Sequence, residues 1–159
     1  MSFSSHDFRK TMGHFTTGVA ILTTCDLENK PHGMTINSLT SASLEPPLLL
    51  FCLNKYSKTA HYFTEAPCFA VNILSGHQES IARSFASHDL KNWNDIKWSS
   101  SSLGNPIIEG SVAVLECKPH AIHAAGDHHI LIAEAHSLDI LSPEKPLVFF
   151  KSKFYSIKE

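Results

Sequence analysis

The sequence predicts a mainly β fold, a β-barrel with peripheral helices, and three observations lead to it. Short runs of apolar or β-branched residues recur along the chain, turn residues separate these runs, and few stretches have helical spacing. With 159 residues and neither a linker nor an internal repeat, residues 1–159 are expected to form one domain with its own core. Closing the sheet into a barrel would also remove exposed strand edges.

A short helix is expected near the N-terminus. Ser4 or Ser5 can cap it, and Phe8, Met12 and Phe15 follow at spacings of four and three residues. This spacing places the three apolar side chains on one stripe, so the helix is expected to lie against the barrel.

The first strands follow from β-branched and apolar runs. Residues 19–24 are predicted to form a strand, and residues 26–31 a turn from which a second strand returns with Gly33, Met34 and Thr35. After the break at Pro46 and Pro47, residues 48–53 are uniformly apolar. They are therefore expected to form a buried strand.

Two further helices are predicted in the middle of the chain. Residues 54–59 form a loop that turns into a helix, with Ser57 as the expected N-cap and an apolar face made of Ala60, Tyr62 and Phe63. A strand over residues 68–74 follows. The second helix covers residues 78–86, in which Ile81, Ala82 and Phe85 have helical spacing.

The last part of the chain combines a polar excursion with three strands. Residues 87–106 are predicted to run over the surface, held by Trp93 and Trp98. Strands are expected over residues 111–121, 130–141 and 147–150, because the second of them alternates between two faces and the others are largely apolar.

Composition narrows the classes of partner and compartment. Thirteen Lys and Arg against fifteen Asp and Glu give a charge of -2, so nucleic acid is not an expected partner. No segment approaches the roughly 20 apolar residues that span a bilayer, and the N-terminus lacks the apolar core of a secretory signal. Cys25, Cys52, Cys68 and Cys117 form no Cys-x-x-Cys pair, which favours free thiols in the cytoplasm.

One long polar motif identifies a family. Residues 33–48 read Gly-x-Thr-x-Asn-Ser-x-Thr-Ser-x-Ser-x-x-Pro-Pro-Leu, which resembles the signature of the flavin reductase-like family. The resemblance extends to Phe8-Arg9, to residues 16–19, to Gly126-Asp127-His128 and to the segment 149–155. It implies an FMN-binding split β-barrel of Greek-key type, dimeric, with the flavin lodged near the subunit boundary.

The resemblance also implies which residues bind the flavin. Contacts to the ring are expected from one set of residues: Met34, Thr35, Asn37, Ser38, Thr40 and the backbone of Cys52, Leu53 and Asn54. Ser57, Lys58 and Thr59, at the start of a predicted helix, fit the phosphate group. The family places Phe85, Ala86, Phe154 and Tyr155 near the flavin or the dimer contacts, and His128 facing the flavin. It often has a Gly where this chain has Lys151-Ser152-Lys153.

Each of these assignments has a simpler alternative. Ser, Thr and Asn are common in turns, Ser57 could be only a helix cap, and Lys58 only a solvated charge. Four histidines could instead bind a metal: His120, His123, His128 and His129. No acidic or thiolate partner stands at a diagnostic spacing, so no metal site is expected.

The predicted activity depends on a cofactor. The chain has no nucleophile elbow, Walker loop, Gly-x-Gly-x-x-Gly or Cys/His zinc spacing, and no side chain can take up a hydride. We therefore expect an NAD(P)H-dependent flavin reductase that uses FMN or FAD, takes NADH or NADPH as co-substrate and supplies reduced flavin to a partner monooxygenase. The alternatives are a flavin carrier or sensor on the same barrel and an enzyme like pyridoxamine-phosphate oxidase.

Overall fold

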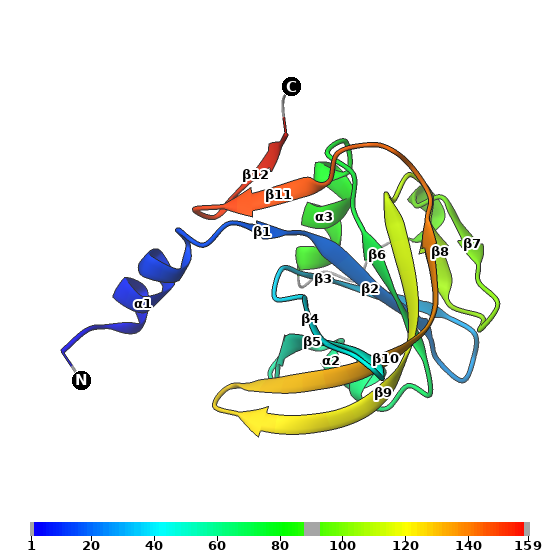
Figure 1. Cartoon of the computed structure of the whole chain (residues 1–159), viewed down its shortest axis with the longest axis horizontal. Coiled ribbons are helices and arrows are strands. Elements are labelled where there is room, and N and C mark those ends of the chain that lie inside the picture. Colours follow the sequence, from blue (N-terminus) through cyan, green and yellow to red (C-terminus); the bar gives the residue numbers. More distant parts are fainter. Residues whose placement is uncertain (1, 88–92, 158–159) are drawn as a thin grey trace.

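A computed structural model describes residues 2–87 and 93–157 of the chain (Figure 1). Its helices are α1 (Ser5–Met12), α2 (Ala60–Thr64) and α3 (Glu79–Ala86), with a 3-10 helix at Trp93–Asp95. Its strands are β1 (Thr17–Gly18), β2 (Ala20–Cys25), β3 (Pro31–Ile36), β4 (Thr40–Leu44), β5 (Pro47–Asn54), β6 (Phe69–Ile73), β7 (Trp98–Ser100), β8 (Pro106–Ile108), β9 (Ala113–Ala125), β10 (His128–Ile140), β11 (Leu147–Phe150) and β12 (Lys153–Ser156).

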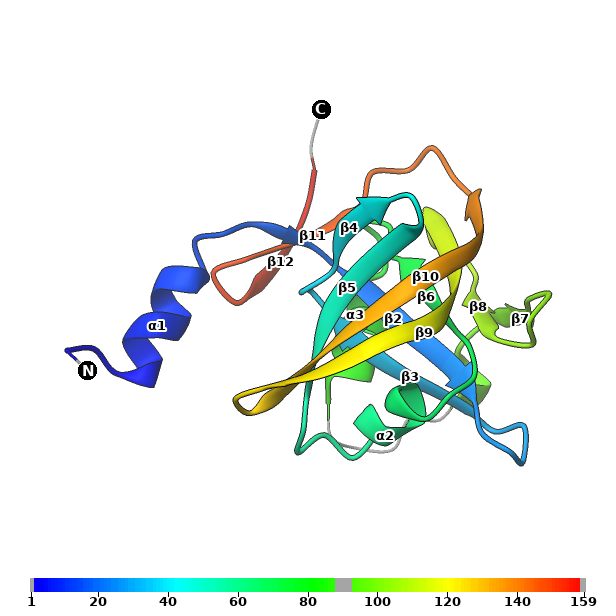
Figure 2. The same ribbon diagram turned by 60° about the horizontal axis from the view of Figure 1, so that its bottom comes forward.

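Seven antiparallel strands form the main sheet, in the order β3-β2-β6-β9-β10-β5-β4. The edge strands β3 and β4 are consecutive in the chain and joined by residues 37–39, so the sheet curls until its two edges meet at one seam (Figures 1 and 2). Strand β1 pairs with β11, which pairs in turn with β12 in a smaller sheet, and β7 pairs with β8. The predicted mainly β fold, a split barrel with peripheral helices, is confirmed.

The strands form where the sequence supplies buried apolar side chains at the right period. Along β5, Leu49, Phe51 and Leu53 are buried and point into the barrel, while Leu50 and Cys52 between them are half-buried on the outer face. Phe51 meets Phe69 of β6 edge to face inside the barrel, with 5.6 Å between the ring centroids. A second apolar cluster lies outside the barrel wall, beneath α3 and β11.

A long hairpin, β9–β10, carries the segment 126–128 at its tip. Its two strands have thirteen residues each, and the register shifts between Ile132 and Ala133 and again between Ala135 and Ser137. Such β-bulges bend a hairpin, which lets one pair of strands be both barrel wall and projecting arm (Figure 2). The tip turns at Gly126, whose φ is 58°.

Helix α1 begins as expected but does not lie against the barrel. Ser4 caps it in a capping box with Asp7, yet Phe8 and Met12 are 58% and 52% exposed. Both views show α1 beside the β11–β12 turn (Figures 1 and 2), where the Lys151 N–H donates to the Gly13 carbonyl over 2.9 Å. The expected packing is wrong because α1 leads into β1, which belongs to the smaller sheet outside the barrel.

Other differences from the sequence predictions are local, and they include the short strands β1, β7 and β8, none of which was predicted. Thr59, not Ser57, is the N-cap residue of α2, and its side chain makes no capping hydrogen bond. Strand β4 was not predicted because its Thr and Ser residues lack the alternation of a half-buried strand. Strand β12 was not predicted either. Part of the expected polar excursion, residues 88–92, lies outside the described residues.

The serines of this excursion hold a buried carboxylate. The Ser101 and Ser102 hydroxyls donate to Glu116 of β9, Ser102 over 2.7 Å, and the Leu103 N–H donates over 3.2 Å. Glu116 is only 4% exposed. Burial raises the pKa of Glu116, but these hydrogen bonds outweigh burial and hold the pKa below its ordinary value. The network therefore fixes the β7–β8 connection to the barrel.

We expect Glu116→Gln to lower the free energy of unfolding by about 1–3 kcal/mol at pH 7, because hydrogen bonds to a charged acceptor are lost. Since the folded pKa is depressed, this contribution is complete above the unfolded pKa and disappears as pH falls through the folded one. Melting curves between pH 7 and pH 3 should therefore show the wild type and Glu116→Gln converging in acid. The exposed Glu109→Gln is the control, and a gap that stays constant with pH would contradict the prediction.

Candidate functional site

A groove of about 660 Å³ runs along the barrel seam, between α1 and the residues that join β3 to β4. We call it the seam groove. Its rim includes Asn37, Ser38 and Thr40, three of the residues expected to bind a flavin ring. Its apolar lining consists of four side chains: Met12, Phe15, Leu39 and Phe149. This volume lies within the range of small-molecule sites, about 300–1,000 Å³.

A smaller hollow of about 170 Å³ adjoins the seam groove, because Asn37 and Phe149 border both. Thr35 and Ala86, two more of the expected residues, line this hollow together with Phe154. The Thr35 hydroxyl donates to the Ala82 carbonyl of α3 over 2.7 Å, which fixes β3 against the helix. The structure thus brings Thr35, Asn37, Ser38, Thr40 and Ala86 to one connected surface.

Ser38 ties the seam to β5. Its hydroxyl accepts a hydrogen bond from the Cys52 N–H over 2.9 Å and lies 3.4 Å from the Cys52 carbonyl. The Cys52 amide, expected to meet the flavin, is therefore already bonded within the chain. The Leu53 side chain is fully buried, and Met34 packs against the barrel core. Cys52, Leu53 and Met34 therefore contribute to the shape of the site, and their side chains do not line it.

A second cluster lies where β5 ends. Asn54 is opposite His128 in the register of β5 and β10. The Lys55 N–H donates to the Asp127 carbonyl over 3.0 Å, and the Lys55 ammonium donates to the Gly126 carbonyl over 2.6 Å. The segment 126–128 is thereby held beside the loop that enters α2, about 7 Å along β5 from Cys52 at roughly 3.3 Å per residue.

Asp127 orients the imidazole of His128. The Nδ1 atom of His128 lies 2.8 Å from a carboxylate oxygen of Asp127, and this hydrogen bond holds the pKa of Asp127 below its ordinary value. The His128 side chain is 39% exposed. With Nδ1 occupied by the carboxylate, Nε2 is the nitrogen left to meet a ligand.

The hydroxyls of Ser57 and Thr59 lie together at the entry to α2. Their oxygens are 3.2 Å apart, and the Thr59 N–H donates to the Ser57 hydroxyl over 3.4 Å. Both residues are half-buried, whereas Lys58 between them is exposed. Two adjacent hydroxyls with a cation close by in sequence suit an anionic group.

Phe85 and Tyr155 border neither hollow. Phe85 is 5% exposed and packs on Gly33, where an added Cβ would lie 2.5 Å from the Phe85 ring. The Tyr155 ring lies near that of Phe150, tilted by 55° with the ring centroids 6.3 Å apart, and the residue that lines the hollow is its neighbour Phe154. Successive strand residues point to opposite faces, which separates the two aromatic side chains.

Sequence reasoning gave no role to Arg9, Thr17, Phe149 or Ser152, although all four line the seam groove. Arg9 and Thr17 belong to stretches that resemble the family, which was the available signal. The Thr17 hydroxyl oxygen is buried and has no hydrogen-bond partner among the described residues. A buried hydroxyl without a partner is unfavourable, so it suits a ligand that offers a polar edge to this wall.

The alternative metal site finds no support in the part of the chain that the structure describes. No three His, Cys, Asp or Glu side chains there are placed to hold a metal ion. His128 and His129 are neighbours on β10 and point to opposite faces of the sheet. No helix within residues 2–87 and 93–157 has the length and apolar character to cross a membrane.

Comparisons with known proteins agree with this geometry. The model of the flavin reductase like domain family matches residues 12–158. The chain is 37% identical over 151 residues to HsaB of Rhodococcus jostii, the reductase subunit of a flavin-dependent monooxygenase, covering 95% of this chain and 77% of that one. It is 40% identical over 131 residues to the FMN reductase (NADH) SmoA of Agrobacterium fabrum, covering 82% and 74%.

A solved structure gives the same result for the fold. The NADH:FAD oxidoreductase SgcE6 of Streptomyces globisporus, in complex with NAD and FAD fragments, superimposes with a TM-score of 0.91 at 35% identity. The match covers 96% of this chain and 92% of that one.

Proposed function

The chain belongs to the flavin reductase-like family, and we propose that it is an NAD(P)H-dependent flavin reductase that binds its flavin in the seam groove. The observation that carries this proposal is the groove itself, with apolar walls, a rim of Asn37, Ser38 and Thr40, and the unpartnered hydroxyl of Thr17. A flat, neutral ring system with a polar edge fits this lining. Residues 1–159 would form one such domain.

A bound flavin supplies the chemistry that no side chain can, acceptance of a hydride from a nicotinamide. The chain supplies binding and orientation. Asn37 and Thr40 are exposed on the rim, where the Asn37 amide can hydrogen bond a ring edge and the Thr40 hydroxyl, which donates to the Ser41 carbonyl over 3.3 Å, can accept from one. Phe149 offers an apolar wall. Ser57, Lys58 and Thr59 would hold the phosphate.

The direct test is a titration of the purified protein with FMN and with FAD, followed by NADH and NADPH under anaerobic conditions. We expect a flavin absorbance spectrum that bleaches when the nicotinamide is added. A flavin carrier or sensor would bind the flavin but would not oxidise either nicotinamide. The two flavins and two nicotinamides, compared at equal concentration, also identify the preferred pair.

We expect His128→Ala to slow flavin reduction about tenfold, equivalent to about 1.4 kcal/mol of transition-state stabilisation. The Asp127 contact holds the ring in place at the end of β5, so the side chain is suited to positioning the nicotinamide. Flavin affinity should change little. Stopped-flow reduction at several NADH concentrations measures the effect.

The control for His128 is His136→Ala, at an exposed position on the same strand. A purely structural role for His128 would lower the melting temperature and leave the reduction rate unchanged. That combination would contradict the proposal.

We propose that the protein is a homodimer. Phe8 and Met12 of α1 and Phe15 beyond its end are more than half exposed, and an isolated helix of eight residues is not stable in water. A second copy would cover this stripe and complete the wall of the seam groove that α1 provides. Light scattering should give twice 17.6 kDa.

The dimer can be tested with Phe8→Gln and Met12→Gln together, which should shift the mass toward one chain. Leu27→Gln, at the fully exposed tip of the β2–β3 turn, is the control and should leave the mass unchanged. A single-chain mass for the wild type with flavin bound would contradict the proposal.

The remaining assignments concern partner and compartment. HsaB is named as the reductase subunit of a flavin-dependent monooxygenase, and a partner monooxygenase is proposed for this chain on that basis. All four cysteines are free thiols in the structure, which suits a reducing compartment such as the cytoplasm.

A further inference from the structure

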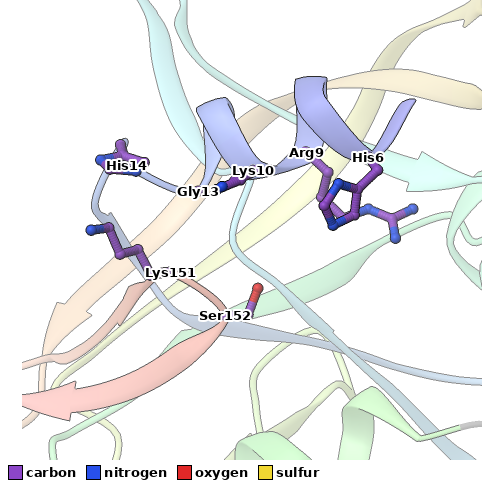
Figure 3. A pocket seen from close by; sticks show the side chains of 7 residues that line it. All are labelled: His6, Arg9, Lys10, Gly13, His14, Lys151 and Ser152. Atoms are coloured by element: carbon purple, nitrogen blue, oxygen red, sulfur yellow. The ribbon is translucent and has the colours of Figure 1, made fainter. Parts of the chain in front are cut away.

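A third hollow, of about 330 Å³, lies between α1 and the β11–β12 turn (Figure 3). Five of the seven residues that line it carry basic side chains: His6, Arg9, Lys10, His14 and Lys151. The other two are Gly13 and Ser152. We call this hollow the cationic pocket.

The positive charge of the cationic pocket is not neutralised by the chain. No carboxylate lines it, and none of its five basic side chains forms an ion pair with a carboxylate of the described residues. The nearest acid in sequence, Asp7, is bonded to the backbone and hydroxyl of Ser4 instead. In a chain with a net charge of -2, such a cluster is a local feature that favours an anionic ligand.

Helix stability does not account for the whole cluster. Arg9 and Lys10 lie in the last turn of α1, where a cation interacts favourably with the helix dipole. His6 lies in the first turn, where it does not. Lys151 comes from a different element, and the hydrogen bond from its N–H to the Gly13 carbonyl holds it at the end of α1.

The β11–β12 turn retains two side chains at a conformational cost. Lys151 and Ser152 have φ angles of 48° and 62°, a region that favours Gly and Asn and is uncommon for other residues. Both residues line the cationic pocket (Figure 3). A turn that would form more easily with Asn-Gly thus keeps an ammonium and a hydroxyl beside the basic face of α1.

The cationic pocket is continuous with the seam groove, because Arg9, Gly13 and Ser152 line both. We propose that it binds the adenosine phosphate of an adenine dinucleotide, the AMP part that NAD(P)H and FAD carry and FMN lacks. This inference rests on the proposed function. Arginine and lysine are the side chains suited to phosphate oxygens, and the concave shape between helix and turn fits a small ligand better than a protein surface.

The test removes two charges that line the cationic pocket and not the seam groove. Lys10→Gln is combined with Lys151→Asn, since Asn tolerates the positive φ of the turn. The matched control is Lys97→Gln with Lys118→Gln, which removes the same charge at exposed positions elsewhere. Calorimetry with ADP alone needs no activity. The wild type and the control should bind ADP, more weakly as salt is added, and the Lys10/Lys151 pair should lose at least tenfold in affinity.

Kinetics and flavin titration distinguish the two sources of the adenosine phosphate. If NAD(P)H is the source, the Lys10/Lys151 double variant raises KM for the nicotinamide about tenfold, with kcat and the affinities for FMN and FAD unchanged. If FAD supplies it, the affinity for FAD falls and the affinity for FMN does not. The inference is overturned if the Lys10/Lys151 double variant binds ADP as tightly as the wild type does. It is also overturned if that variant leaves both the KM for the nicotinamide and the affinity for FAD unchanged. If the wild type does not oxidise NADH, that result instead contradicts the proposed function.

Discussion

Replacing Asn72 with Leu is expected to lower the free energy of unfolding by about 2–4 kcal/mol, because it removes the centre of a buried hydrogen-bond network. Asn72 of β6 is fully buried. Its side-chain amide donates to the Ile21 carbonyl over 3.2 Å and to the Thr23 hydroxyl over 2.9 Å, and its carbonyl accepts from the Ile108 N–H over 2.9 Å. Leu has a similar volume but would leave the Ile108 N–H buried without a partner.

Urea denaturation of the apoprotein measures this effect. Asn37→Leu makes the same substitution at an exposed position and should change stability by less than about 0.5 kcal/mol. The network also joins β2, β6 and β8, so the variant should weaken the attachment of β8 first. A loss for Asn72→Leu as small as the loss for Asn37→Leu would show that the network contributes little.

Replacing Ser57 with Ala and Thr59 with Val together should weaken FMN binding about a hundredfold or more. Each charge-assisted hydrogen bond to a phosphate contributes roughly 1.5–3 kcal/mol, and the two hydroxyls lie 3.2 Å apart, close enough to bind one phosphate group. Thr59→Val alone should have a smaller effect. Fluorescence titration of the apoprotein with FMN gives the affinities.

Riboflavin is the ligand control for this pair, because it has the ring but no phosphate and should lose much less affinity. Thr64→Val is the protein control, since Thr64 lies at the other end of α2 and bonds only to the His61 carbonyl. Equal losses for FMN and riboflavin would mean that the two hydroxyls do not contact the phosphate.

The apolar strands were predictable because their signal is local, whereas the polar strand β4 and the position of α1 were not. The uniformly apolar run of residues 48–53 and the alternation along residues 130–141 each indicate a strand, and the structure confirms both strands. The stripe of Phe8, Met12 and Phe15 shows only that a helix has an apolar face. Which surface covers that face depends on the pairing of β1 with β11, which no local pattern encodes.

The features of the candidate site also divide into those that the sequence could predict and those that it could not. The motif of residues 33–48 located Asn37, Ser38 and Thr40 on the groove, because a long signature fixes several positions at once. It could not show that the Ser38 hydroxyl is bonded to the Cys52 backbone. The sequence also could not show that Phe85 is buried on Gly33 while Ala86 is exposed. That difference depends on which face of α3 each residue occupies.

The pairing of β1 with β11 has a consequence for synthesis on the ribosome. Thr17 is opposite Phe149 in this ladder, and Leu147 closes the second apolar cluster against α3. Contacts between segments so distant in the chain form late and slow folding. The barrel strands β2 to β10 can therefore begin to pair while the nascent chain is still being extended. The groove cannot close until β11 has left the exit tunnel, so the ability to bind flavin should appear only after translation has passed this strand.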